Sequence, residues 1–136
     1  MNQFNEIADL ALRAITKRAK ELNMKGTAIV AVSEGDPIRS WTSKMLVLET
    51  FKKVPAGDEP AMNTIAVAYS KAAEMADTLQ ASGSGVRPPL IGEYGWPGGV
   101  VARGKIGFLF AAFSGGPGED DAKAAQVGLT VLLEKL

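Results

Sequence analysis

With 136 residues the chain is the size of one domain, and its 46% apolar and 22% charged residues are ordinary for a globular protein. Lysine plus arginine (15) equals aspartate plus glutamate (15), which argues against a nucleic-acid binder and against a polybasic membrane contact. The chain has no cysteine and no histidine, which excludes disulfides, thiolate chemistry, a serine–histidine–aspartate triad and imidazole ligands for zinc or haem.

The first predicted element is an amphipathic helix over residues 3–23. Its apolar stripe has spacings of three and four positions and consists of Phe4, Ile7, Ala8, Ala11, Ile15, Ala19 and Leu22. The N-terminal residues show no basic region followed by an apolar one, and no apolar run approaches the roughly 20 residues of a membrane helix. We therefore expect a cytoplasmic protein that does not enter a membrane.

Two extended segments are predicted next. Residues 27–32 (TAIVAV) are rich in β-branched residues without alternation, as in a strand that is covered on both faces. A turn over residues 33–37 separates them from residues 38–51, which predict either one long strand or two pieces. Residues 52–60 (KKVPAGDEP) predict a loop.

A second helix is predicted over residues 61–80. Asp58 or Glu59 is the expected cap, with Pro60 in the first turn. Many of its apolar positions are alanines, which indicates close packing against a sheet or another helix. The glycine- and serine-rich residues 81–85 then predict a connecting loop.

The C-terminal part predicts three short strands and a helix. Residues 90–94 indicate one strand, and residues 100–101 and 106–113 predict a hairpin around a polar turn. A helix is expected over residues 119–135. The order helix, two strands, helix, three strands, helix predicts the α/β (α+β) class, with one antiparallel sheet and helices packed on it in a single domain over residues 1–136.

Several motifs along the chain are similar to those of a known family. The first helix is followed by an apolar strand at residues 28–32 and an acidic-glycine turn at residues 33–36, and the second helix carries Lys71-Ala72. The most specific motifs are C-terminal: Gly98-Gly99, Arg103-Gly104-Lys105, the apolar run 106–113, Ser114-Gly115-Gly116, Glu119-Asp120-Asp121, and Ala125 with Gly128. In these motifs the sequence resembles the GlcG/HbpS-like family, also called the haem-degrading domain family, over most of its length.

The resemblance implies a profilin-like domain with a five-stranded antiparallel sheet, and oligomers built from such domains. It also implies a small ligand, because some members bind haem or another tetrapyrrole and others are accessory proteins of small-metabolite operons. A haem ligand in this chain would not be a histidine, because the chain has none.

Ser114, Gly115 and Gly116 form the first candidate ligand site. Glycines let a ligand approach the backbone, and the helix that follows offers free N–H groups. The acids at 119–121 already occupy the positive end of that helix, which argues against a phosphate ligand. The alternative, which we favour, is a tight glycine turn capped by these acids. Adjacent acids diverge on a helix, so we expect no metal site there.

Tyr94, Trp96 and Arg103 form the second candidate site. Aromatic rings and an arginine fork suit a flat apolar ligand with carboxylates, and Tyr94 is a candidate axial oxygen ligand for haem. The same aromatic residues are also typical of a subunit interface, the interpretation that we favour. No nucleophile with an adjacent base is visible, so we assign no catalytic residue.

The sequence therefore predicts an oligomeric accessory protein that binds itself and a small ligand, with haem as a candidate cofactor by resemblance. Two alternatives remain. One is a structural protein that acts through its subunit interface. The other is an enzyme in which Arg103 anchors a small carboxylate metabolite.

Overall fold

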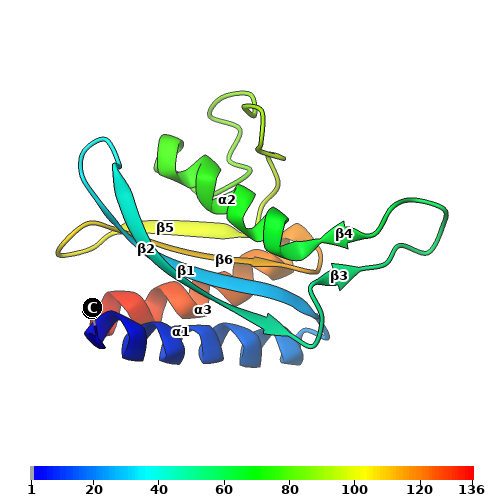
Figure 1. Ribbon diagram of the computed structural model, residues 1–136, viewed down its shortest axis with the longest axis horizontal. Coiled ribbons are helices and arrows are strands. Elements are labelled where there is room, and N and C mark those ends of the chain that lie inside the picture. The colour runs from blue at the N-terminus through cyan, green and yellow to red at the C-terminus, as the bar shows by residue number, and fades with distance from the viewer. Residues whose placement is uncertain (1) are drawn as a thin grey trace.

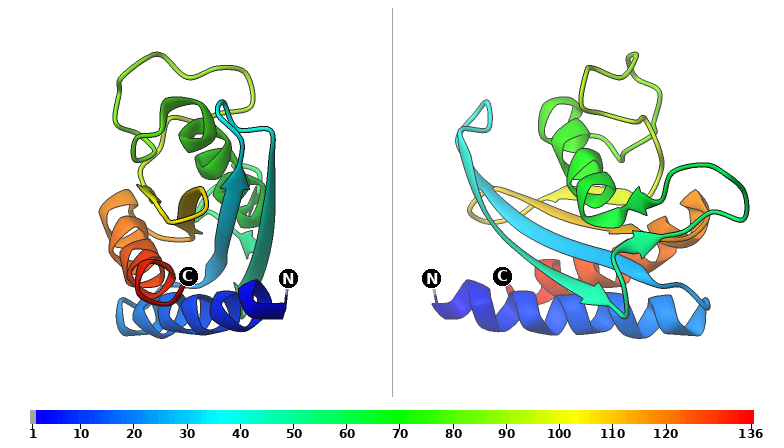
Figure 2. Two further views of the ribbon diagram at one scale, coloured as in Figure 1. Left: turned by 90° about the vertical axis from the view of Figure 1, so that its left-hand side faces the viewer. Right: turned by 45° about the vertical axis from the view of Figure 1, so that its right-hand side comes forward.

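The computed structural model describes residues 2–136 as an antiparallel sheet with helices on both faces (Figure 1). The elements in chain order are α1 (Asn2–Glu21), β1 (Gly26–Glu34), β2 (Ser40–Leu48), β3 (Lys52–Lys53), β4 (Met62–Asn63), α2 (Thr64–Thr78), β5 (Gly99–Arg103), β6 (Phe108–Ser114) and α3 (Gly118–Lys135). The main sheet has the strand order β2-β1-β6-β5, and all of its pairs are antiparallel. The predicted α+β class is confirmed. Helices α1 and α3 lie side by side under one face, and α2 covers the other (Figure 2).

Strand β1 lies at the centre of the sheet and is buried on both faces. Ala28, Val30 and Val32 pack in the core formed with α1 and α3, whereas Ile29 and Ala31 pack on the side of α2. Because both faces are covered, neither set of positions is polar, which explains the apolar run without alternation.

The two helices of the lower layer pack closely because their contact residues are small. A side chain at Gly128 of α3 would collide with Ile15 of α1, and Ala11 and Ala125 are fully buried nearby. A larger residue at position 128 would push the helices apart and open the core.

Helix α2 begins three residues later than predicted, at Thr64. Its cap is Asn63, whose side chain accepts hydrogen bonds from the backbone N–H groups of Ile65 and Ala66. The prediction that Asp58 or Glu59 caps this helix is therefore wrong. Met62 and the cap residue Asn63 form β4 and pair with Lys53 and Lys52 of β3, so part of the predicted loop at residues 52–60 is a short strand.

The predicted fifth strand of the main sheet is absent from the part of the chain that the structure describes. Residues 90–94 form a turn, because the Glu93 carboxylate accepts hydrogen bonds from the Leu90 N–H and the Arg87 guanidinium. The five-stranded sheet is thus corrected to four strands with a separate two-stranded sheet, β3-β4. The other predicted elements are present. The extended segment predicted over residues 38–51 forms β2, which ends at Leu48 because the next residue, Glu49, has a left-handed backbone conformation with φ 64°.

Candidate functional site

The glycine corner between β6 and α3 is built by close backbone contact with the start of β1. A side chain at Gly115 would collide with the carbonyl oxygen of Lys25, and one at Gly26 would collide with that of Ser114. Glycine is thus required here by the packing of one backbone on another, and the corner is held next to β1.

A buried ion pair lies beneath the corner. Lys71 Nζ of α2 is 3.0 Å from Asp121 Oδ2 of α3, and the two side chains are 3% and 4% exposed. Lys71 also donates to the Phe113 carbonyl oxygen at 2.8 Å, and Asp121 Oδ1 accepts from the Gly116 N–H at 2.9 Å. Gly98 leaves room for the pair, since a side chain there would collide with Lys71 Nζ. The pair therefore ties both helices to the end of β6.

Burial dominates the protonation of both partners. It lowers the pKa of the Lys71 ammonium and raises the pKa of the Asp121 carboxyl, while the attraction between the two charges opposes both shifts. No side-chain nitrogen or oxygen buried within residues 2–136 lacks a hydrogen-bond partner. Each charged atom of the pair thus has at least one hydrogen-bond partner, which offsets part of the cost of burying the two charges.

Only one of the three acids at the start of α3 takes part in the corner. The N-cap of α3 is Pro117, and no side chain caps the helix. Asp121 accepts a hydrogen bond from the Gly116 N–H and so stabilises the corner, but the prediction that these acids cap α3 is wrong. Glu119 and Asp120 make no such contact.

A cavity of about 250 Å³ opens above the ion pair. It is lined by Lys53, Met62, Lys71, Trp96, Pro97, Ser114, Gly115, Gly116, Gly118 and Asp121. The structure thus brings Trp96 of the second candidate site together with Ser114, Gly115 and Gly116 of the first. Tyr94 does not line this cavity but stacks on Trp96, with ring centroids 4.5 Å apart.

Arg103 lies away from the other predicted residues. It lines a separate cavity with Gly104, Lys105, Leu109, Leu133 and Leu136, and its guanidinium sits 4.5 Å above the Phe108 ring. These lining side chains include no carboxylate, hydroxyl or thiol that could act on a substrate held by Arg103. The structure therefore separates Arg103 from Tyr94 and Trp96.

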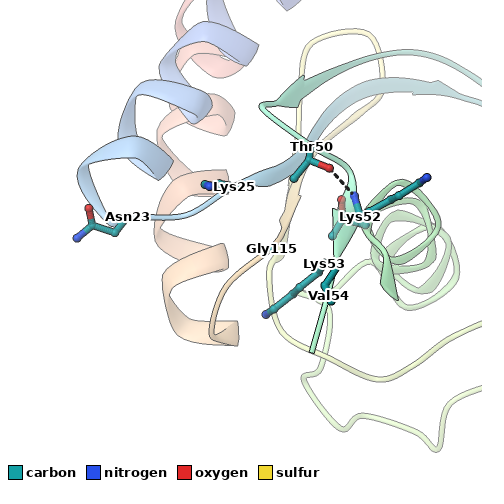
Figure 3. A pocket seen from close by; sticks show the side chains of 8 residues that line it. Asn23, Lys25, Thr50, Lys52, Lys53, Val54 and Gly115 are labelled. Carbon is teal, nitrogen blue, oxygen red and sulfur yellow. Dashed lines mark hydrogen bonds between the residues drawn. The ribbon is translucent and has the colours of Figure 1, made fainter. Parts of the chain in front are cut away.

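A second cavity of about 390 Å³ adjoins the first and shares Lys53 and Gly115 with it (Figure 3). Its lining is basic and polar and contains Asn23, Lys25, Thr50, Lys52, Lys53, Val54, Thr64 and Gly115. In Figure 3 the side chain of Lys53 extends towards the corner at Gly115, whereas that of Lys52 extends the opposite way. We call the two spaces together the corner cavities.

Buried hydroxyl groups fix the segment that carries Lys53. Thr64 donates its hydroxyl to the Phe51 carbonyl oxygen at 2.9 Å, and its N–H donates to the same oxygen at 2.8 Å. Thr27 of β1 is 2.9 Å from the Thr64 hydroxyl and supplies the hydrogen, because that of Thr64 is already used. The backbone next to Lys53 is therefore hydrogen-bonded to α2 and, through Thr64, to β1.

Sequence reasoning missed the contribution of Lys53, Lys71 and Asp121 to the corner cavities. One signal was present, because Lys71 lies between Ala68 and Ala72 on the buried side of α2, where an unpaired charge is costly. Its partner is 50 residues away in the chain. The structure holds no metal-binding cluster of three acidic, histidine or cysteine residues within 2–136, and none of its helices there is long and apolar enough to cross a bilayer.

Comparison with known proteins gives fold neighbours only. No protein-family model and no curated protein sequence matches the chain. A crystal structure of a PduOC–haem complex is similar with a TM-score of 0.64 and 18% identity, covering 93% of this chain and 91% of that one. HbpS is similar with a TM-score of 0.64 and 19% identity, covering 93% and 87%. Protein ORFY from Klebsiella pneumoniae has a TM-score of 0.60 and 16% identity, covering 96% and 90%.

Proposed function

We propose that this chain, which has the fold of the GlcG/HbpS-like proteins, binds a small, partly apolar ligand in the corner cavities. One observation carries the proposal. The aromatic side chain of Trp96 and the side chains of Lys53 and Lys71 line the same cavity, next to the glycine corner. Ligand sites are typically concave, largely apolar and equipped with a few oriented polar groups. The smaller corner cavity supplies the apolar surface with Met62, Trp96 and Pro97, and the larger one supplies the polar groups.

A tetrapyrrole is one ligand whose periphery these residues would suit. Its flat ring would stack on the Tyr94–Trp96 pair, whose side chains are 51% and 41% exposed, and its carboxylates would meet Lys53. In an alternative pose, without stacking on this pair, the Tyr94 phenol would be the axial ligand, since tyrosine is a known axial ligand of haem. The PduOC neighbour is a haem complex, which supports testing haem on this chain.

Titration with haemin tests the tetrapyrrole version. We expect a Soret band that shifts and saturates at a fixed stoichiometry, and that weakens in Trp96→Ala and Tyr94→Phe. Ile91→Ala is the matched control, because Ile91 is fully exposed on the same loop and does not line the cavities. An equal loss in all three variants would indicate haemin adsorbed on an apolar loop, and no spectral change would reject haem.

Self-association through the loop between α2 and β5 is a second proposed function. Val86, Leu90 and Ile91 are exposed there, next to the half-exposed Tyr94 and Trp96, and clustered exposed apolar side chains are typical of an interaction surface. We propose a second copy of the chain as the partner. Sedimentation velocity should show an oligomer that Ile91→Ser weakens, and a monomer at all concentrations would contradict this function.

A further inference from the structure

We infer that Lys53 recognises a carboxylate group on the ligand, and that this group lies at the junction of the corner cavities. The inference rests on the proposed ligand-binding function of the same site. It defines the chemical class of the ligand as a molecule that places one carboxylate group at this junction and carries an apolar or aromatic part. The apolar part rests on Trp96, which lines the smaller cavity with Lys53.

Lys53 is the cation at this junction whose charge no acid neutralises. Lys25 is 3.3 Å from Glu49, and Lys71 is paired with Asp121. Lys53 is in no ion pair formed within residues 2–136, and it lines both cavities. An unmatched ammonium at the border of two cavities favours an anion there.

The charge of Lys53 also affects the pKa of both members of the buried Lys71–Asp121 pair, which indicates where its ammonium lies. Burial is the main cause that lowers the pKa of Lys71, and the charge of Lys53 adds to it. The same charge acts to lower the pKa of Asp121, against the effect of burial. Both effects indicate that the Lys53 ammonium is directed towards the corner, as Figure 3 shows. An anion bound beside Lys53 would therefore offset a repulsion that the free protein contains.

The balance of charge favours a monoanion over a phosphate dianion. Lys52 and Lys53 are both in no ion pair formed within residues 2–136, but Lys52 lines only the larger cavity and extends the other way, so one free positive charge faces the junction. Glu119 and Asp120 stand in the first turn of α3 next to the corner, and they would repel a second charge. The Thr64 hydroxyl is already committed as a donor to Phe51, so it has no hydrogen left for a phosphate oxygen.

Two matched probes test the inference by NMR on isotope-labelled protein. Indole-3-acetate has an aromatic ring for Trp96 and a carboxylate for Lys53, whereas indole-3-acetamide has the same shape without the charge. We expect the acid to shift the amide signals of Gly115 and Gly116 and to bind about five-fold or more tightly than the amide. Lys53→Gln should abolish this preference. Lys17→Gln is the control and should keep it, because Lys17 carries the same charge, is exposed and lines neither corner cavity.

Each remaining outcome overturns the inference. These are equal affinity for acid and amide, an equal effect of the two lysine variants, tighter binding of inorganic phosphate than of the acid, and no shifts up to about 10 mM probe. Failure of the proposed function looks different, because then neither haemin nor either indole probe binds. Haemin binding without a preference for the acid over the amide would reject only the role of Lys53.

Discussion

Replacing Lys71 by methionine should destabilise the protein strongly while hardly changing the volume of the side chain. The substitution leaves the Asp121 carboxylate buried without its counter-charge and removes the donor to the Phe113 carbonyl oxygen. Breaking a buried ion pair by removing one partner costs about 3–5 kcal/mol. We therefore expect the free energy of unfolding at pH 7 to fall by about 4 kcal/mol.

The corresponding change in melting temperature follows from the chain length. An unfolding entropy of about 2.1 cal/mol/K per residue gives about 0.29 kcal/mol/K for 136 residues. A loss of about 4 kcal/mol then lowers Tm by about 14 °C. Lys123→Met is the matched control, because Lys123 is exposed and lies 3.8 Å from Asp120 on the same helix as Asp121. It should change stability by less than about 0.5 kcal/mol.

A second substitution and a change of pH separate the charge effect from a packing effect. Asp121→Asn keeps an acceptor for the Gly116 N–H but removes the charge, so it should restore part of the stability lost in Lys71→Met. Burial already raises the pKa of Asp121 above 3.8, and loss of Lys71 removes the main opposing attraction. The folded variant then binds the proton more tightly than the unfolded chain does. Its deficit relative to the unsubstituted protein should therefore shrink as the pH falls from neutral towards 3.8.

Urea unfolding followed by circular dichroism at neutral and at acidic pH measures these differences. Two results together refute the reasoning. The double variant Lys71→Met/Asp121→Asn is no more stable than Lys71→Met, and the stability deficit of Lys71→Met does not change with pH. That result would mean that the Lys71 side chain acts through packing alone.

Three further predictions concern the corner, a helix cap and the loop before β5. Gly115→Ala should destabilise by about 1–3 kcal/mol in urea unfolding, because the new Cβ collides with backbone, whereas Gly57→Ala, in open space, should be nearly neutral. Asn63→Ala should cost about 1 kcal/mol by loss of the α2 cap, and a loss below the error of thermal unfolding would contradict that role. The Arg87 hydrogen bonds lower the pKa of Glu93, so their stabilisation is present above the unfolded value of 4.5 and is lost as the pH falls through the folded value. The protection factors of the loop amides, which are exchange rates corrected for the intrinsic rate at each pH, should fall on acidification, and they should fall less in Arg87→Ala.

The ends of the elements show where sequence reasoning reached its limit. The helix at residues 3–23 and the strand at residues 27–32 were predicted correctly because their period and burial are set by local pattern. Residues 90–94 were wrongly predicted as a strand, because their apolar composition gives no sign of the Arg87–Glu93 contacts that fold them into a turn. The cap of α2 was misplaced for a similar reason, since several polar residues compete in that region.

In the candidate site, too, some features were predictable from the sequence and others were not. Trp96 and the glycines of the corner stood out in the sequence, because an aromatic ring suits a flat ligand and glycines let a ligand approach the backbone. The grouping was different in space, since Arg103 lies in another cavity while Lys53 joins the corner.

The sequence by itself determined the α+β class, the central apolar strand, most helices and the glycine corner, because each depends on residues close together in the chain. Tertiary structure alone decided the Lys71–Asp121 pair, the corner cavities and the position of Lys53. These features join residues that are 50 or more positions apart in the chain. Whether two such charges meet depends on how the helices pack on the sheet, and no local pattern records that.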